Sequence, residues 1–343
     1  MSKESPEYLR TSLAAAMTLG FKNGLFYRDA KLFCINLLLT YDSGCAGNCG
    51  YCGLSMRRPG TYEDKSFIRV EWTAYKLTDI MERISENVDR VKRICLSMIT
   101  NKRARKDTWE ITKTLRQDLD IPISLLSSPT ILDKSDLYRF KENGADMIGI
   151  AVDCATPHLF EKIRGKTVKG PHKWEKYWKY YEEALEIFGK RKAGVHLIVG
   201  LGETEREMIE TIQKAYDMGG CTHLFSFFPE CNSLLSQHPQ PPVGQYRRVQ
   251  LARFLIDEGI SRIDNFSFDS FGKLIDFGIL QDNLSSIIET GTPFMTSGCP
   301  GRDGEVACNR PYANCPPGPK IRNFPFPPEK EDIQKINKEL WRR

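Results

Sequence analysis

Three cysteines near the N-terminus, Cys45, Cys49 and Cys52, fall within eight residues and are interleaved with glycines. Thiolates are the soft ligands that iron-sulfur clusters require, and glycine lets a short loop turn its backbone amides toward a compact object. A structural zinc loop is the alternative, but it normally fills four positions with two ligand pairs, and the chain has no second C-x2-C pair. The spacing therefore predicts a 4Fe-4S cluster with one iron open to a substrate or cosubstrate.

A second group, Cys299, Cys308 and Cys315, lies in a stretch rich in Gly, Pro and Asn. Because this stretch has too few apolar residues to fold around a core of its own, we expect a metal centre, a second 4Fe-4S cluster, to order it. Its fourth ligand must come from elsewhere, and Cys231 is the candidate, with Ser297 or a substrate atom as rivals. A closed zinc site and unliganded cysteines remain alternatives.

Short apolar runs alternate with helical patterns along the chain, which is typical of parallel strands joined by right-handed crossovers. The eight runs span 32–41, 94–100, 123–127, 147–153, 194–200, 222–228, 263–268 and 293–297. Eight such units favour a closed barrel over an open sheet. We therefore expect an α/β fold, a (β/α)8 TIM-type barrel over 32–298, with an N-terminal extension, 1–31, and a Cys/Pro/Gly-rich C-terminal extension, 299–343.

Several helices are indicated by periodicity and by capping residues. An apolar stripe is formed by Leu77, Ile80, Met81, Ile84 and Val88. Further helices are expected over 12–19, after Thr156-Pro157, behind the Thr204/Glu207 capping box and over 329–341. Because barrel enzymes place their chemistry at the C-terminal ends of the strands, we expect Cys45, Cys49, Cys52 and Cys299 at that end.

Composition narrows the function classes. The 41% apolar content suits one large domain, and no apolar run is long enough to span a bilayer. The modest net charge of +5 does not imply nucleic acid. The N-terminal residues lack an export pattern, so we expect a cytoplasmic protein without membrane attachment, in which eleven cysteines indicate metal chemistry and not disulfides. The scattered ones are expected in the core or strands: Cys34, Cys95, Cys154 and Cys221.

The spacing Cys45-x3-Cys49-x2-Cys52 after the first predicted strand resembles the signature of the radical S-adenosylmethionine (SAM) enzymes. The resemblance implies that the amine and carboxylate of SAM chelate the open iron. Electron transfer would then yield a 5'-deoxyadenosyl radical that abstracts hydrogen from an unactivated carbon.

The same resemblance implies cosubstrate contacts at the strand ends. They are Tyr51 near the adenine, Ser97 and Met98 at the methionyl amine, Asp153 at the ribose, Arg164 at the carboxylate, and Ile198 and Gly200 flanking the adenine. The Gly-Gly-Glu common near Ser97 in the family is absent here. For Ile198 and Gly200 a buried strand followed by a glycine turn is the alternative.

The strand 144–153, the helix end near Arg164 and the C-terminal cysteine motifs look like the biotin-synthase-related branch and are similar to the two-protein lipoyl synthases. This implies sulfur insertion from the auxiliary cluster into an octanoyl chain on a lysine of a lipoyl-carrier protein. A related partner synthase would insert the other sulfur, and a donor such as ferredoxin would supply electrons. The alternatives are a permanent second cluster serving methylation, rearrangement or peptide maturation, and a non-catalytic iron-sulfur or zinc protein.

Overall fold

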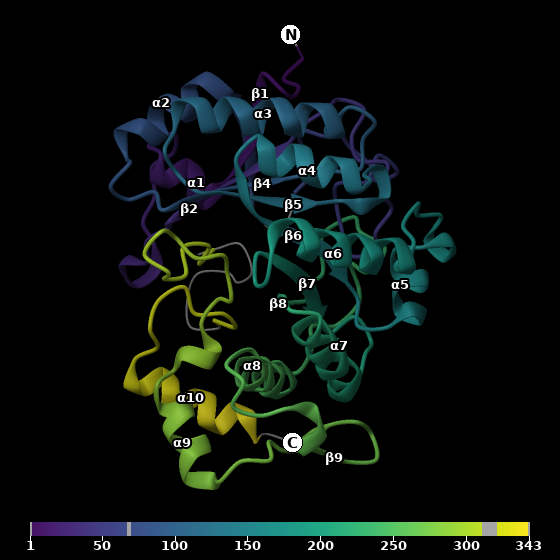
Figure 1. The fold of residues 1–343 in the computed structure, drawn as a ribbon, viewed down its shortest axis with the longest axis vertical. Helices are drawn as coiled ribbons and strands as arrows, with labels where there is room; N and C mark the ends of the chain where they lie inside the picture. The colour runs from purple at the N-terminus through teal and green to yellow at the C-terminus, as the bar shows by residue number, and fades with distance from the viewer. Residues whose placement is uncertain (1, 67–69, 311–320, 342–343) are drawn as a thin grey trace.

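A computed structural model of the chain describes residues 2–66, 70–310 and 321–341. They contain an eight-stranded sheet in the order β3-β1-β2-β4-β5-β6-β7-β8 (Figure 1). Its parallel strands correspond to the first six predicted runs: β2 (Cys34–Leu39), β4 (Arg93–Ser97), β5 (Ile123–Ser127), β6 (Ala145–Asp153), β7 (Ala193–Val199) and β8 (Cys221–Ser226). The predicted α/β class is confirmed.

The inner strands are buried along their length. Every residue of β2 and of β4 is inaccessible to solvent. Parallel strands covered on both faces carry continuous apolar runs in place of alternation, which is why the sequence located them well.

The N-terminal residues join this sheet. β1 (Tyr8–Ser12) lies between β2 and β3 (Trp72–Lys76) and is antiparallel to both. Leu9 pairs with Leu39 on one side and with Tyr75 on the other. The stretch expected as an N-terminal extension therefore supplies a strand of the sheet.

The last two predicted barrel strands are wrong. Residues 263–268 form a 3-10 turn, Ile263–Asn265, and a two-residue strand, β9 (Ser267–Phe268), which pairs with β10 (Leu274–Asp276) in a separate hairpin. Residues 293–297 contain a second turn, Thr292–Phe294. Asp-Asn in the first run and a proline without an N–H in the second favour turns over ladder pairing. In the described residues the sheet thus ends at β3 and β8, and the barrel is not closed by parallel strands.

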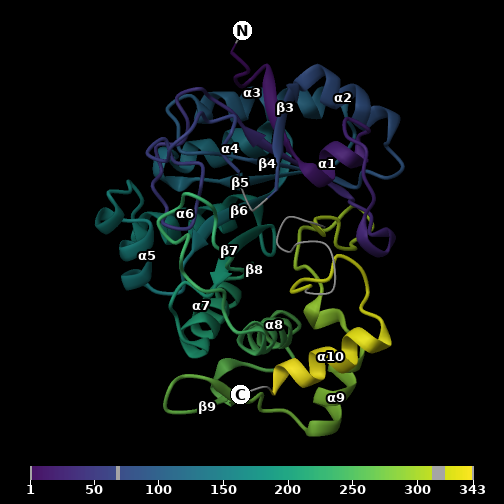
Figure 2. The ribbon, with the colours of Figure 1, turned by 180° about the vertical axis from the view of Figure 1, so that it is seen from behind.

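Helices cover the outer side of the curved sheet, and the last two helices of the described chain pack with a third helix beyond its edge (Figures 1 and 2). Their bounds are α1 (Leu13–Thr18), α2 (Leu77–Glu86), α3 (Ala104–Asp118), α4 (Lys134–Glu142), α5 (Pro157–Ile163), α6 (Trp174–Phe188), α7 (Glu205–Asp217), α8 (Val243–Asp257), α9 (Gln281–Glu289) and α10 (Lys330–Leu340). The predicted helices are confirmed. In α2, Leu77, Ile80 and Ile84 are buried, whereas Val88 lies beyond the helix end and is exposed.

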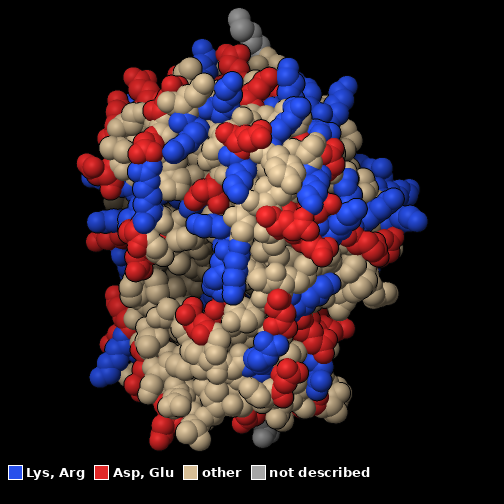
Figure 3. Space-filling model, in the orientation of Figure 1, with Lys and Arg blue, Asp and Glu red and all other residues tan. Residues whose placement is uncertain are grey.

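Charges of both signs intermingle on the face shown in Figure 3, in keeping with the modest net charge. Among the helices of the described residues, none is both long and apolar enough to cross a bilayer.

The N-terminus of α7 carries a capping box that offers a test of stability. Thr204 Oγ1 accepts a hydrogen bond from Glu207 N (3.2 Å), and the Glu207 carboxylate accepts one from Thr204 N (2.7 Å). We expect Thr204→Ala to lower the free energy of unfolding by about 1 kcal/mol, because one amide loses its acceptor. Denaturant melts check this, with Thr204→Ser as the control that keeps the cap; equal losses in both variants would contradict the role of the hydroxyl.

Candidate active site

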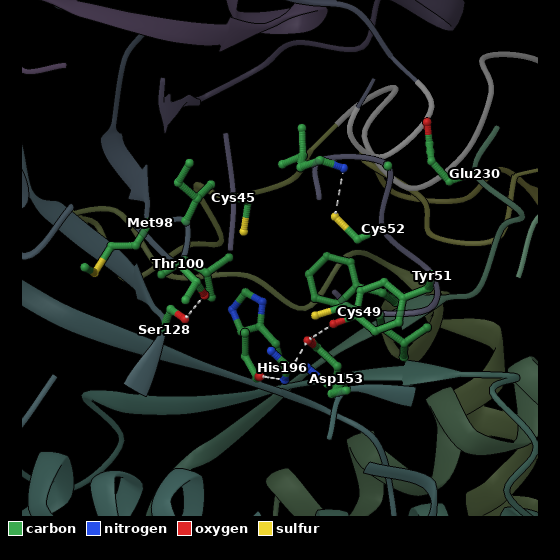
Figure 4. A pocket seen from close by; sticks show the side chains of 18 of the residues that line it. Cys45, Cys49, Tyr51, Cys52, Met98, Thr100, Ser128, Asp153, His196 and Glu230 are labelled. Carbon is green, nitrogen blue, oxygen red and sulfur yellow. Dashed lines mark hydrogen bonds and ion pairs between the residues drawn. The ribbon is translucent and has the colours of Figure 1, made fainter. Parts of the chain in front are cut away.

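The loop after β2 carries the first cysteine group. Cys45, Cys49 and Cys52 line one cavity at the C-terminal ends of the strands, as Figure 4 shows. The empty space of this cavity, including the solvent at its open mouth, is about 1190 Å³. Backbone hydrogen bonds fix the loop to its surroundings: Ala46 N donates to Thr100 O (2.7 Å) and Gly50 N to Ile163 O (2.8 Å). The three predicted ligands are therefore brought together on one cavity wall.

Two glycines in this loop leave no room for a side chain. A Cβ at Gly47 would lie 3.1 Å from His172 Nε2 and 3.2 Å from Cys45 Sγ. A Cβ at Gly53 would lie 2.9 Å from the carbonyl oxygen of Ser66. The absence of a side chain at these two positions therefore lets the loop lie close against its neighbours.

The donor set fits an iron-sulfur cluster. All three thiols are free, and burial raises the pKa of Cys45 to about 11 and that of Cys52 well above its usual value. Such thiols keep their protons in the metal-free protein, so a bound metal would displace the protons and supply the countercharge. Cys45, Cys49 and Cys52 are the residues that would hold it.

Tyr51, Asp153 and Arg164 form a polar group on the same cavity wall, in which Asp153 and Arg164 are buried and Tyr51 is half-buried. The Tyr51 hydroxyl donates to Asp153 Oδ2, and Arg164 Nη1 lies 3.0 Å from the same oxygen (Figure 4 shows the first contact). Arg164 also donates to Val152 O (3.0 Å). Burial raises the pKa of Asp153, while Arg164 and Tyr51 oppose that rise. The structure thus joins three predicted SAM contacts, whose individual roles remain predictions.

The fifth parallel strand, β7, ends in a turn built on glycine. Gly200 has φ +103°, and a Cβ there would meet Pro241 Cδ at 2.5 Å. The Glu203 carboxylate accepts hydrogen bonds from Gly200 N (2.6 Å) and Leu201 N (2.9 Å). Ile198 lines the cavity. The segment is thus a buried strand that ends in a glycine turn, and this is compatible with the predicted contacts of Ile198 and Gly200 with the cosubstrate.

At the end of β4, Met98 lines the cavity, whereas Ser97 is buried in the strand. Sequence reasoning missed other residues of the cavity wall, among them Thr100, Ser128, His172, His196, Glu230 and Arg310. His196 lies within β7 and Arg310 stands two residues after Cys308, whereas the others follow strands or lie in loops where no local pattern marks them.

His172 is the clearest of these omissions. Its Nδ1 lies 2.6 Å from Thr130 Oγ1 and 2.8 Å from the Tyr177 hydroxyl. Its Nε2 is buried, has no hydrogen-bond partner among the described residues, and lies on the Gly47 side of the ring. Burial and the positive charge of Arg164 lower the pKa of His172 to about 2.

The His172 shift predicts a pH dependence of stability. The unfolded histidine takes up a proton near pH 6.5 and the folded one only near pH 2, so stability is present above pH 6.5 and is lost as the pH falls. Between pH 7 and pH 5 we expect a loss of about 2 kcal/mol from this group. Urea melts of the metal-free protein should show a steeper decline for wild type than for His172→Asn; parallel curves would refute the assignment.

The two described members of the second cysteine group lie at the other end of the barrel. Cys299 and Cys308 are buried in one cluster with Cys34, Cys95 and Met147. The carbonyl of Pro300 accepts a hydrogen bond from Arg93 Nε (2.6 Å), and Arg93 is the first residue of β4. The expectation that Cys299 lies at the C-terminal ends of the strands is therefore wrong, because 293–297 is not a barrel strand and its direction does not set the position of Cys299.

Of the two remaining predicted ligands, Cys231 does not join Cys299 and Cys308. Cys231 is exposed in the loop after β8, with its carbonyl oxygen 3.8 Å from the Cβ position of Gly53 at the first cysteine group. As a fourth ligand beside Cys299 and Cys308 it is contradicted by this location. Cys315 lies outside the described residues.

Comparison with known proteins shows which protein family the sequence resembles. Residues 41–215 match the profile of the radical SAM superfamily. A biotin synthase from Actinobacillus succinogenes is 25% identical over 177 residues, 50% of this chain and 46% of that protein. Another, from Novosphingobium aromaticivorans, is 20% identical over 279 residues, 76% of this chain and 68% of that protein. The first match thus spans about half the length of that relative.

Solved structures give weaker likenesses. A radical SAM methyltransferase from Kitasatospora setae, with cobalamin and a [4Fe-4S] cluster bound, aligns with 76% of this chain and 52% of its own at 13% identity and a TM-score of 0.41. The coproporphyrinogen III oxidase of Escherichia coli covers 59% of this chain and 47% of its own at 14% identity and a TM-score of 0.35. The superfamily profile, by contrast, matches just over half of the chain and includes the first cysteine group and its cavity partners Asp153 and Arg164. The chain therefore belongs to the radical SAM superfamily.

Proposed function

We propose that this radical SAM enzyme inserts sulfur into an unactivated C–H bond, and that its substrate is an octanoyl chain on a lysine of a lipoyl-carrier protein. The sulfur comes from an auxiliary 4Fe-4S cluster at the second cysteine group. Biotin-synthase relatives, themselves weak matches, support the sulfur chemistry.

The observation that carries the proposal is the position of the two cysteine groups relative to one interior space. The cavity at Cys45, Cys49 and Cys52 and a smaller cavity at Cys299 and Cys308 share residues of their walls. The shared residues are Leu126, His196 and Arg310. A sulfur donor at one end and a radical generator at the other would therefore both face a substrate carbon held between them.

The wall of that space suits a hydrocarbon chain. Leu38, Leu126, Ala151, Ile198 and Phe225 supply aliphatic and aromatic surface. The ring of His196 stacks on that of Phe225, with centroids 5.1 Å apart and planes at 28°. Apolar surface of this kind excludes water from a carbon radical and gives a hydrocarbon chain a surface to pack against.

In this proposal, different residues of the chain bind the cluster and the cosubstrate. When bound, the cluster supplies the electron for reductive cleavage of SAM to a 5'-deoxyadenosyl radical. Cys45, Cys49 and Cys52 hold that cluster at the cavity mouth. Tyr51, Asp153 and Arg164 fix one another by hydrogen bonds and present polar atoms for the cosubstrate beside apolar surface for the substrate.

Partners follow from the same proposal. The carrier protein brings the octanoyl-lysine, a related partner synthase inserts the other sulfur, and a donor such as ferredoxin supplies electrons.

Anaerobic reconstitution with iron and sulfide, then reduction with SAM and an octanoyl-lysyl peptide, tests the proposal. We expect about eight irons per chain, since each 4Fe-4S centre holds four, together with 5'-deoxyadenosine and a peptide heavier by sulfur. Sulfide counted before and after turnover should fall.

Deoxyadenosine with an unchanged peptide would reject the octanoyl substrate. Constant sulfide with a modified substrate would favour the second candidate, a permanent auxiliary cluster serving methylation, rearrangement or peptide maturation.

A further inference from the structure

Four cysteines from distant parts of the chain meet inside the barrel. Cys34, Cys95, Cys299 and Cys308 have relative exposures of 0%, 4%, 9% and 2% and belong to one buried cluster. Cys34 is the first residue of β2 and Cys95 lies within β4, so the cluster is near the N-terminal ends of neighbouring strands. The first two were expected to be ordinary apolar core residues.

Cys308 is at the centre of this group. Cys34 and Cys95 pack with it in the same buried cluster. Asn36 Nδ2 lies 3.8 Å from Cys308 Sγ and 3.9 Å from Cys34 Sγ. The sulfurs of Cys34 and Cys308, 274 residues apart in the sequence, therefore share one polar neighbour.

Positive and neutral donors surround these sulfurs. Arg310 Nε donates to Cys308 Sγ at 3.1 Å, and His223 Nε2 lies 4.0 Å from Cys299 Sγ. Burying a guanidinium beside a neutral thiol costs free energy, and this cost is offset when the thiol becomes a negatively charged thiolate. Cysteines that served only as small apolar core residues would not need such a cation beside them. The surroundings are those of a thiolate site and not of a plain core.

We propose that Cys34 and Cys95 complete the auxiliary centre with Cys299 and Cys308, so that a 4Fe-4S cluster is bound by four protein thiolates at the N-terminal ends of β2 and β4. The inference rests on the auxiliary cluster of the proposed function; it replaces Cys231 as a ligand, and its four thiolates take the place that the sequence prediction gave to Cys315. Arg310 neutralises part of the charge of the thiolates and lines both cavities, so the cluster lies beside the space that holds the substrate.

The test removes the first cluster so that only the second is measured. The full chain carrying Cys45→Ala, Cys49→Ala and Cys52→Ala is reconstituted with iron and sulfide under anaerobic conditions. We expect about four irons per chain and the EPR signal of a reduced 4Fe-4S centre. On this background, Cys34→Ser and Cys95→Ser should each lose at least half of the iron or shift the g-values, because an oxygen ligand replaces sulfur.

Matched controls are Cys154→Ser, which changes another buried cysteine, and Cys231→Ser, which changes the rival ligand. Both should keep the iron and the signal. Serine preserves side-chain volume, and thermal melts of the metal-free variants identify any that do not fold; Cys34→Ala and Cys95→Ala then serve as second variants.

Two results would overturn the inference in different ways. Full iron and an unchanged signal in the Cys34 and Cys95 variants, with loss in Cys299→Ser and Cys308→Ser, would reject these two ligands and leave the auxiliary cluster standing. No iron, or zinc in its place, on the background alone would reject both the inference and the sulfur source of the proposed function.

Discussion

Cys49→Ala is expected to abolish formation of 5'-deoxyadenosine, to below detection, under reducing conditions with SAM. Cys49 is the middle ligand of the three that line the cavity, and two remaining thiolates cannot hold a cubane with one open iron. Iron per chain should fall by about four, the content of one centre. Anaerobic product analysis by mass spectrometry, together with iron counting, measures both effects on the same sample.

The matched control is Cys154→Ala, which removes a buried thiol near the same end of the barrel without touching the cavity. It should keep the iron and the deoxyadenosine. Deoxyadenosine formation by Cys49→Ala at the wild-type rate would mean that the cluster has other ligands.

Arg164→Met should destabilise the protein by about 3–5 kcal/mol, because it leaves the Asp153 carboxylate buried without its cation. Both side chains are nearly inaccessible, at 4% and 11% exposure, so solvent cannot replace the lost partner. The guanidinium also lies over the rings of Phe160 and Tyr177, at 5.1 Å and 4.8 Å from their centroids, and methionine keeps only part of that packing. Denaturant unfolding of the metal-free protein measures the loss.

The double variant Asp153→Asn/Arg164→Met separates charge from packing. If the unpaired carboxylate causes the loss, the double variant is more stable than Arg164→Met alone. The deficit of the single variant should also shrink toward low pH, because protonation of Asp153 removes the buried charge. A deficit that is independent of pH and unchanged in the double variant would assign the effect to packing.

Features of the site that are set by a local sequence pattern could be predicted, whereas features set by contacts between distant residues could not. The first cysteine group was predictable because ligand spacing within eight residues is a local property, and the strand before it is a continuous apolar run. The polar group of Tyr51, Asp153 and Arg164 was found only through resemblance, since its members are up to 113 residues apart, from 51 to 164. His172 gave no signal, since nothing local shows that its ring turns toward the cysteine loop.

The second cysteine group shows where such reasoning fails. Residues 293–297 have the composition of a short strand, but short apolar runs do not distinguish strand from turn, and here Pro293 opens a turn. Once that strand was assumed, Cys299 was assigned to the wrong end of the barrel. Its contacts with Cys34 and Cys95 depend on how the chain returns after residue 290, which periodicity does not encode.

The segment that covers the N-terminal ends of the strands, which includes Pro300 and Asn309, is synthesised after those strands. Asn309 Nδ2 donates to Lys31 O across 278 residues, and Arg93 donates to Pro300 O across 207. Every strand of the main sheet is therefore synthesised before the segment that closes the floor of the barrel. Iron and sulfide can thus reach the interior from this side until residues 299–309 dock.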